Sequence, residues 1–188
     1  MDLKRNTRIL GIDPGTNFLG YAIIEVIGRE VKLIECDVLN IKKGFAPQEK
    51  LEAIFKRITF LIDKHLPHSL AIEAPFFGKN IQSMLKLGRA QGIAMAAGIS
   101  KGLEIIEYSP KKVKQSVTGN GNASKEQVKA MITSTFYLKS DITSFDAADA
   151  LAVALCHHYQ TSNGINPGTG GNSWKKFLRD NPKRIAKR

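Results

Sequence analysis

Four acidic residues stand at the borders of apolar segments, where carboxylates are unusual. Asp13 and Glu73 each end a short apolar run, and Asp146 and Asp149 stand three apart at the head of the apolar stretch 150–155. A carboxylate in a core-like segment costs free energy unless a cation or hydrogen bonds meet it. Two strand-end acids and a helical pair offer only oxygen ligands, which suit Mg²⁺ or Mn²⁺ better than zinc. The four acids therefore predict a divalent metal site.

Three of these acids also fit ordinary structural roles. Asp13 opens an Asp-Pro-Gly-Thr turn, Glu73 could be a solvent-facing strand end, and Asp146 fits a capping box with Thr143. Asp149 fits none of these roles, because it lies one turn inside an apolar helical segment. Residues three apart share a helix face, and like charges at that spacing repel unless a cation or a shared proton intervenes. Asp149 is thus the acid that most favours the metal interpretation.

The charge of the chain indicates a polyanionic partner. Its 188 residues include 28 basic and 17 acidic side chains, a formal net charge of +11, and its length is typical of one domain. Such a basic excess attracts phosphate polymers or anionic lipid surfaces. Lipid fits less well, because no apolar stretch approaches the ~18 residues of a membrane span and the N-terminus has no signal-peptide core. Cys36 and Cys156 form no disulfide framework, which favours a reducing cytoplasm and a cytoplasmic protein without membrane contact.

The basic residues are concentrated at the C-terminus. Residues 174–188 hold seven basic side chains against one acid, so this segment carries +6 of the net charge. A stretch rich in Gly, Asn, Ser and Thr precedes it and is typical of a linker. The sequence therefore predicts one folded domain over 1–160 and a flexible linker with a basic tail over 161–188. The tail either binds a polyanion or only keeps the protein in solution.

The elements that must position the acids follow from the apolar periodicity. Strands are expected at 8–13, 18–27 and 31–39 as an antiparallel meander, followed by a buried strand at 69–73 and another near 104–107. Helices are expected over 47–66 before the buried strand, over 81–100 between the last two strands, and after them over 110–117, from 125 onward and over 145–159. This order predicts an α/β fold with a mixed five-stranded sheet, three strands of meander plus two parallel strands, flanked by helices.

The helix expected over 81–100 is unusually rich in small residues. It carries Gly88, Ala90, Gly92, Ala94, Ala96, Ala97 and Gly98. Glycine weakens a helix, so its repeated use indicates close packing against another element. That element is either the protein's own sheet or the same helix of a second subunit.

Several separately spaced motifs together resemble one family. They are Ile9-Leu10-Gly11-Ile12-Asp13-Pro14-Gly15 with Gly20-Tyr21, Ala71-Ile72-Glu73-Ala74-Pro75-Phe76, Leu85-Lys86-Leu87-Gly88, Val113-Lys114-Gln115, Lys125-x-Gln127-Val128 and Asp146-Ala147-Ala148-Asp149-Ala150. In this order, from about residue 8 to residue 158, the chain resembles the RuvC Holliday-junction resolvases. The resemblance implies an RNase H-like fold, a homodimer, and Mg²⁺-dependent, paired, symmetric nicking of four-way DNA junctions in recombination and repair. It also raises the RuvA–RuvB branch-migration complex as a partner.

The resemblance also assigns roles to residues. Asp13, Glu73, Asp146 and Asp149 correspond to the catalytic, metal-binding acids of the family, and some relatives carry histidine at the position of Asp146. Two Mg²⁺ ions per active site are expected, with Mn²⁺ as the alternative metal. Lys114 and Lys125 match two lysines that the family places near the scissile phosphate. Phe76 matches an aromatic residue that family members press against bases at the junction.

Further DNA contacts are expected beside these positions. The complete expected set is Phe76, Phe77, Lys79, Lys86, Arg89, Lys111, Lys112, Lys114 and Lys125. The simpler interpretation of the lysines is phosphate positioning without a part in the chemistry. The simpler interpretation of the two phenylalanines is burial, although neighbouring side chains of an extended segment point to opposite sides.

Three rival functions remain at this stage. An RNase H-like nuclease acting on RNA, as the YqgF-type proteins do, would lack the basic and aromatic junction surface that Phe76, Lys114 and Lys125 indicate. An actin-like ATPase shares the Asp-x-Gly-Thr motif but needs a far longer chain. In a non-catalytic DNA-binding protein, the four acids would serve only caps and turns.

Overall fold

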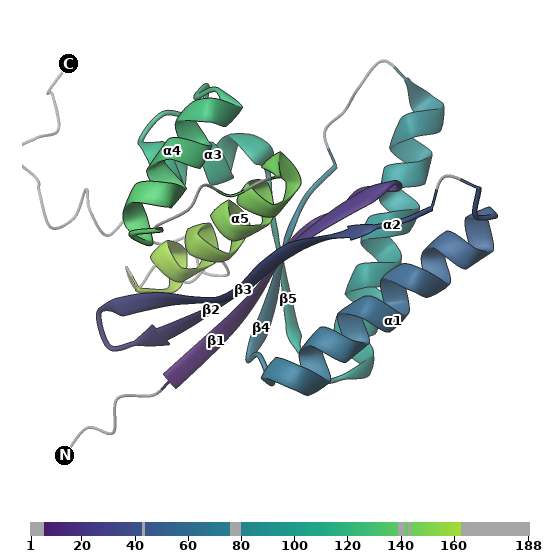
Figure 1. Cartoon of the computed structure of the whole chain (residues 1–188), viewed down its shortest axis with the longest axis horizontal. Coiled ribbons are helices and arrows are strands. Elements are labelled where there is room, and N and C mark those ends of the chain that lie inside the picture. The colour runs from purple at the N-terminus through teal and green to yellow at the C-terminus, as the bar shows by residue number, and fades with distance from the viewer. Residues whose placement is uncertain (1–5, 43, 76–79, 139–141, 143, 163–188) are drawn as a thin grey trace, which may run out of the picture. The chain divides into compact units, whose positions relative to one another are not determined.

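The computed structural model describes residues 6–42, 44–75, 80–138, 142 and 144–162. Its sheet begins with the antiparallel strands β1 (Asn6–Asp13), β2 (Phe18–Ile27) and β3 (Glu30–Asn40), and continues with β4 (Ser69–Glu73) and β5 (Glu104–Tyr108). The strand order is β3-β2-β1-β4-β5, with β4 parallel to β1 and β5 parallel to β4. The predicted mixed five-stranded sheet is therefore confirmed (Figure 1).

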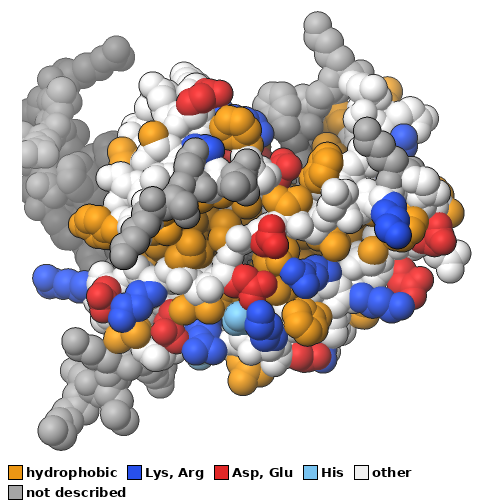
Figure 2. Space-filling view, viewed as in Figure 1, with side chains coloured by type: hydrophobic (Ala, Val, Ile, Leu, Met, Phe, Trp, Pro, Cys, Tyr) orange, Lys and Arg blue, Asp and Glu red, His pale blue; other side chains and the backbone are white. Residues whose placement is uncertain are grey.

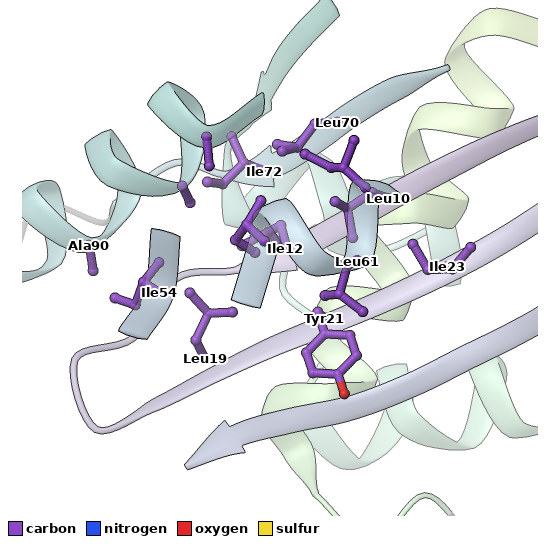
Figure 3. Packing of buried hydrophobic residues seen from close by; sticks show 14 of the residues in the cluster. Leu10, Ile12, Leu19, Tyr21, Ile23, Ile54, Leu61, Leu70, Ile72 and Ala90 are labelled. Atoms are coloured by element: carbon purple, nitrogen blue, oxygen red, sulfur yellow. The ribbon is translucent and has the colours of Figure 1, made fainter. Parts of the chain in front are cut away.

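Two helices cover one face of this sheet. Helix α1 (Pro47–His65) has proline in its first turn and ends at Leu66, whose left-handed backbone, with φ of 49°, precedes Pro67. Helix α2 (Ile81–Ser100) begins where the Asn80 side chain accepts the Ser83 backbone N–H at 3.1 Å. Both helices contribute to one apolar core with the strands, and Figure 3 shows its side chains converging between α1, α2 and the sheet.

The small residues of α2 divide between two faces of that helix. Ala90, Ala94 and Ala97 are buried in the core, and a Cβ atom at Gly98 would lie 2.6 Å from a methyl group of Ile105. These residues confirm close packing of α2 on its own sheet. The remaining small residues lie on the exposed side of the helix.

Helix α5 (Phe145–Ser162) lies on the opposite side of the sheet from α1 and α2, together with α3 (Pro110–Thr118) and α4 (Lys125–Thr135) (Figure 1). Its residues 147–148 and 150–158 are buried. His157 lies within this helix, and its ring contacts the Ser69 hydroxyl at 3.1 Å and the Tyr108 hydroxyl at 2.9 Å. These contacts match a structural role for that histidine.

Some boundaries differ from the sequence-based expectation. Strand β5 continues to Tyr108, and α5 continues to Ser162, so the first two residues of the predicted linker are helical. Backbone hydrogen bonding of a long buried helix outweighs the local preferences of Thr161 and Ser162. Cys36 and Cys156 are free thiols. Among the described residues, no helix has both the length and the apolar character needed to span a membrane.

Candidate active site

Two of the four acids meet at the carboxyl ends of neighbouring parallel strands. Ile12 of β1 is paired with Ile72 of β4, so Asp13 and Glu73, one residue further on, end adjacent strands. Ile12 and Ile72 belong to the core under α1 and α2. Because side chains alternate along a strand, Asp13 and Glu73 face the opposite side of the sheet, where α5 lies.

Two glycines bring α5 directly onto the sheet. A Cβ atom at Gly20 would overlap the backbone oxygen of Asp146, and one at Gly11 would overlap the backbone oxygen of Ala150. Gly20 is also the residue paired with Asp13 across the β1–β2 ladder. The absence of side chains at Gly11 and Gly20 therefore lets the first turns of α5 approach the end of β1 where Asp13 stands.

The start of α5 differs in detail from the expected capping box. Thr143 lies outside the described residues, and the helix begins at Phe145, one residue after Ser144. The Ser144 hydroxyl accepts the Asp146 backbone N–H at 3.2 Å and so caps the helix. Asp146 lies in the first turn, where a negative charge is favourable.

A lysine from another helix already contacts Asp149. Lys125 Nζ lies 2.9 Å from Asp149 Oδ2, and the Asp149 side chain is only 19% exposed. Lys125 is the first residue of α4, whose start is fixed by a capping box between Ser124 and Gln127. This cap positions Lys125 to form the ion pair.

A cavity of about 530 Å³ unites the acids with the lysines. Its lining includes Asp13, Glu73, Asp149, Lys111, Lys114 and Lys125. The loop that joins α3 to α4 contributes Gly121 and Asn122, and a Cβ atom at Gly121 would lie 2.8 Å from Lys111 Cγ. The loop thus packs closely against the lysine-bearing helix α3. Three carboxylates and three ammonium groups share one opening to solvent.

The carboxyl groups strongly perturb one another. Burial, and then the charges of Glu73, Asp149 and Asp146, raise the pKa of Asp13 to about 8, and Lys125 offsets this only in part. Burial and the charge of Asp149 raise the pKa of Glu73 to about 7. The hydrogen bond to Asp149 raises the pKa of Lys125. Burial and the neighbouring carboxylates therefore outweigh the lysines in their effect on the pKa values of Asp13 and Glu73.

The donor set fits a hard divalent cation chemically. Carboxylate oxygens are the ligands that Mg²⁺ and Mn²⁺ favour, and a bound cation would remove the repulsion that raises the pKa values of Asp13 and Glu73. Within the described part of the chain, no three Asp, Glu, His or Cys side chains are grouped closely enough to hold a metal ion as they stand. The Lys125–Asp149 contact occupies one of the carboxylate oxygens that a cation would need.

Not every expected site residue reaches this cavity. Asp146 does not line it, although its charge acts on Asp13. Lys112 belongs to α3 but is not among the lining residues, and Lys86 and Arg89 line a different cavity beside α1 and α2. The expected contacts Phe76, Phe77 and Lys79 lie outside the described residues.

Comparison with known proteins identifies the family. A family profile described as "Crossover junction endodeoxyribonuclease RuvC" matches residues 9–157. A protein of that name from Cytophaga hutchinsonii is 50% identical over 177 residues, which cover 94% of this chain and 87% of the relative. Another, from Christiangramia forsetii, is 49% identical over 183 residues, covering 97% and 95%. The chain belongs to the RuvC family.

Solved structures agree with this membership in the RuvC family. Thermus thermophilus RuvC in complex with a Holliday junction substrate matches with a TM-score of 0.80 and 30% identity, over 85% of this chain and 97% of that one. The yeast mitochondrial Holliday junction resolvase, at 18% identity and a TM-score of 0.64, shares the fold. The resemblance and the RNase H-like fold class predicted from the sequence are thus confirmed.

Sequence reasoning missed several lining residues of this RuvC-family cavity, among them Ser109, and one packing role. Ser109 lines the cavity, and its hydroxyl also accepts the Lys112 backbone N–H at 3.3 Å at the start of α3. Its place directly after β5 and before a proline was the available signal, because β5 ends beside β4 and Glu73. Gly20 allows α5 to approach the sheet closely. This role depends on a tertiary contact, and nothing in the neighbouring sequence indicates it beyond the glycine itself.

Proposed function

We propose that this protein is a structure-selective endonuclease that resolves four-way DNA junctions by paired, symmetric, Mg²⁺-dependent nicks. The observation that carries the proposal is the cavity in which Asp13, Glu73 and Asp149 face three lysines. Carboxylates that need a cation and lysines that attract phosphate together match phosphodiester hydrolysis. Membership in a family named for crossover junction endodeoxyribonucleases supports four-way DNA junctions as the substrate.

Asp13, Glu73, Asp146 and Asp149 would hold two Mg²⁺ ions, with Mn²⁺ as the alternative. When bound, such a pair supplies an activated water and stabilises the leaving oxygen. Asp13 is the proposed shared ligand, because the charges of the other three acids all act on it.

The two catalytic lysines have different proposed roles. Lys125 is paired with Asp149 and would hold that carboxylate in place until the site is loaded. Lys114 lines the cavity and has no ion-pair partner among the described residues, so its ammonium group is available to the scissile phosphate. Lys111 would position the neighbouring backbone.

A homodimer formed through α2 would supply a second active site, which would make the second nick. Ile81, Leu85 and Ile99 are 71%, 52% and 63% exposed, an unusual exposure for large apolar side chains. Gly88 and Gly92 lie on the same exposed side, with nothing within 4 Å of a Cβ atom at either position. Spacings of three and four along α2 make these residues one apolar stripe, which a second α2 could approach closely. Two active sites related by a two-fold axis would cut opposing strands symmetrically.

Other partners stay predictions. The basic segment 174–188 and the aromatic residue Phe76, proposed for DNA contact, lie outside the described residues. Contact with a RuvA–RuvB branch-migration complex and a cytoplasmic location follow from the sequence-based reasoning alone.

A cleavage assay with matched variants tests the proposal. The wild-type protein, Asp13→Asn and Asp63→Asn are mixed with a synthetic four-way junction, a linear duplex or an RNA hairpin, with Mg²⁺ or with EDTA. Asp63 is an exposed acid on α1 that pairs with Lys101 at 2.7 Å, so its variant repeats the charge change away from the cavity. We expect paired nicks on the junction only, lost in Asp13→Asn although binding persists, and kept in Asp63→Asn.

Three results would contradict the proposal. Equal cutting of linear duplex would show that the protein does not select the junction structure. Preferential cutting of the RNA hairpin would favour an RNase H-like nuclease that acts on RNA. Activity that survives EDTA would remove the role of the carboxylates as metal ligands.

A further inference from the structure

A second cavity lies on the other face of the sheet from the carboxylates. It has a volume of about 320 Å³ and is enclosed by α1, α2 and the turn between β1 and β2. Phe45, Leu51 and Ile54 provide apolar walls, and Lys50, Lys86 and Arg89 provide three positive charges. No acidic residue is among its described lining residues. A pocket of this size with apolar walls and a few convergent polar groups is typical of a ligand site.

The cations of this cavity are available to an anion. Lys50 Nζ contacts only neutral oxygens in its vicinity, the Thr16 backbone oxygen at 3.3 Å and Asn17 Oδ1 at 2.9 Å. Lys86 and Arg89 have no ion-pair partner within the described part of the chain. Lys42 does not line the cavity, but its Nζ lies 5.8 Å from the centre of the Phe45 ring. The α1 and α2 side of Figure 2 shows basic side chains beside apolar and acidic ones.

The occupant must combine negative charge with an apolar or aromatic body. The chain's own C-terminal segment is excluded on charge, because residues 174–188 carry seven basic side chains and one acid. A nucleotide and an acidic peptide with an apolar side chain both satisfy this chemistry.

The position of the cavity favours the nucleotide. Thr16 and Asn17, which line it, follow Asp13 by only three and four residues. Four residues span at most ~14 Å, so the cavity begins within a few nucleotides of the carboxylates. A DNA strand at Asp13 that continues over this edge of the sheet would reach Lys50 and Phe45 directly. A peptide has no comparable reason to bind beside the reacting strand.

We propose that this cavity is a nucleotide subsite for the junction strand that is nicked. An unpaired base near the branch point stacks on Phe45 and packs against Leu51, and its phosphate contacts Lys86 and Arg89. The combination of an aromatic platform with a basic groove is how proteins hold single-stranded nucleic acid. The inference rests on the proposed function and adds a site that fixes the strand after it leaves the carboxylates.

Abasic substitution on the DNA, combined with variants of the protein, tests this subsite. The full chain carrying Asp13→Asn binds a set of four-way junctions in which one base at a time is removed on either side of the nick. We expect one position, within a few nucleotides of the nick, where the missing base weakens binding about fivefold. Adding Phe45→Leu should abolish that dependence, because the leucine keeps the apolar wall and removes the aromatic face.

Phe60→Leu is the matched control. Phe60 is also an aromatic residue of the α1 region, but it is 53% exposed and does not line the cavity. The abasic effect should persist in this variant. An abasic scan without any sensitive position, or with equal sensitivity in Phe45→Leu, would overturn the subsite.

Methyl NMR of Leu51 and Ile54 provides a second measurement. Their resonances should shift on addition of the junction and should not shift with an acidic, phenylalanine-containing peptide at equal concentration. A response to the peptide alone would overturn the nucleotide assignment. Junction nicking by the wild-type protein is measured in parallel. Persistent nicking with a flat abasic scan refutes only the subsite, whereas loss of junction binding and nicking refutes the proposed function as well.

Discussion

Replacement of Asp13 by asparagine should stabilise the metal-free protein, and the gain should increase with pH. Asp13 keeps its proton up to a pKa of about 8 in the folded protein, against an ordinary value of 3.8. Between these two pH values the unfolded chain has released this proton and the folded protein retains it. Folding therefore takes up a proton, and the stability of the wild-type protein falls as the pH rises through this window.

The size of the effect follows from the displaced pKa. Retention of one proton costs up to ~1.4 kcal/mol for each pH unit above the ordinary pKa. The Asp13 carboxyl group thus costs up to ~4 kcal/mol of folding free energy at about pH 7 and up to ~2 kcal/mol at about pH 5. Asparagine has the same shape and does not titrate, so the variant avoids this cost at both pH values.

Urea unfolding in EDTA, at several pH values between about 5 and 7, measures this difference. The free energy of unfolding is compared among the wild-type protein, Asp13→Asn and the control Asp63→Asn, whose side chain is 57% exposed. Added Mg²⁺ should stabilise the wild-type protein more than Asp13→Asn, because a ligand of the folded state stabilises by mass action. The reasoning would be refuted if the advantage of Asp13→Asn were the same at both ends of the pH range, or if Asp63→Asn reproduced it.

Three further changes test other parts of the site. Lys125→Met should lower kcat by about 100-fold at saturating Mg²⁺. It should also move the acidic limb of the pH–rate profile to higher pH, because Lys125 lowers the pKa values of Asp13 and Glu73. The control Lys56→Met removes a surface lysine paired with Glu52 and should change neither kcat nor the pH–rate profile. Gly20→Ala should cost ~1–3 kcal/mol of stability by thermal or urea unfolding, because its Cβ would overlap the Asp146 backbone, whereas Gly44→Ala, with open space around it, should be neutral. Leu85→Glu should convert a dimer to a monomer in sedimentation experiments without lowering the melting temperature, since Leu85 is 52% exposed in one chain; a wild-type protein that sediments only near 20.7 kDa would contradict the dimer itself.

The fold could be predicted from the sequence because its local signals agree with one another. Pro47 and Pro67 bracket α1, Ser124 and Gln127 cap α4, and β4, apolar between Ser69 and Glu73, has the pattern of a buried parallel strand. Boundaries failed where local and tertiary preferences conflict. Residues 161–162 are typical of a linker in isolation, but they continue a helix that the sheet already stabilises.

The site could be predicted only in its chemistry. The strand-end positions of Asp13 and Glu73 follow from apolar runs, and the spacing of Asp146 and Asp149 places them on one helix face. The contact of Lys125 with Asp149 joins residues 24 apart through the packing of α4 on α5, which no local pattern encodes. For the same reason the sequence could not show that Lys86 and Arg89 would line a separate cavity from Lys111 and Lys114.

The charge balance of the cavity links proton, metal and substrate binding. Asp13 and Glu73, with pKa values of about 8 and 7, hold protons near neutral pH, and Lys125 neutralises Asp149. In this resting state the ammonium groups of Lys111 and Lys114 leave the cavity with a net positive charge, so it attracts DNA, and no bare carboxylate is left buried. Loading of the site must release the protons of Asp13 and Glu73 and free the Lys125 ammonium group. That freed charge stands beside Lys114 at the wall of the same cavity, where the phosphate of the nicked strand is proposed to lie. Activity should therefore increase with pH through the range in which these carboxyl groups lose their protons, while the stability of the metal-free protein decreases.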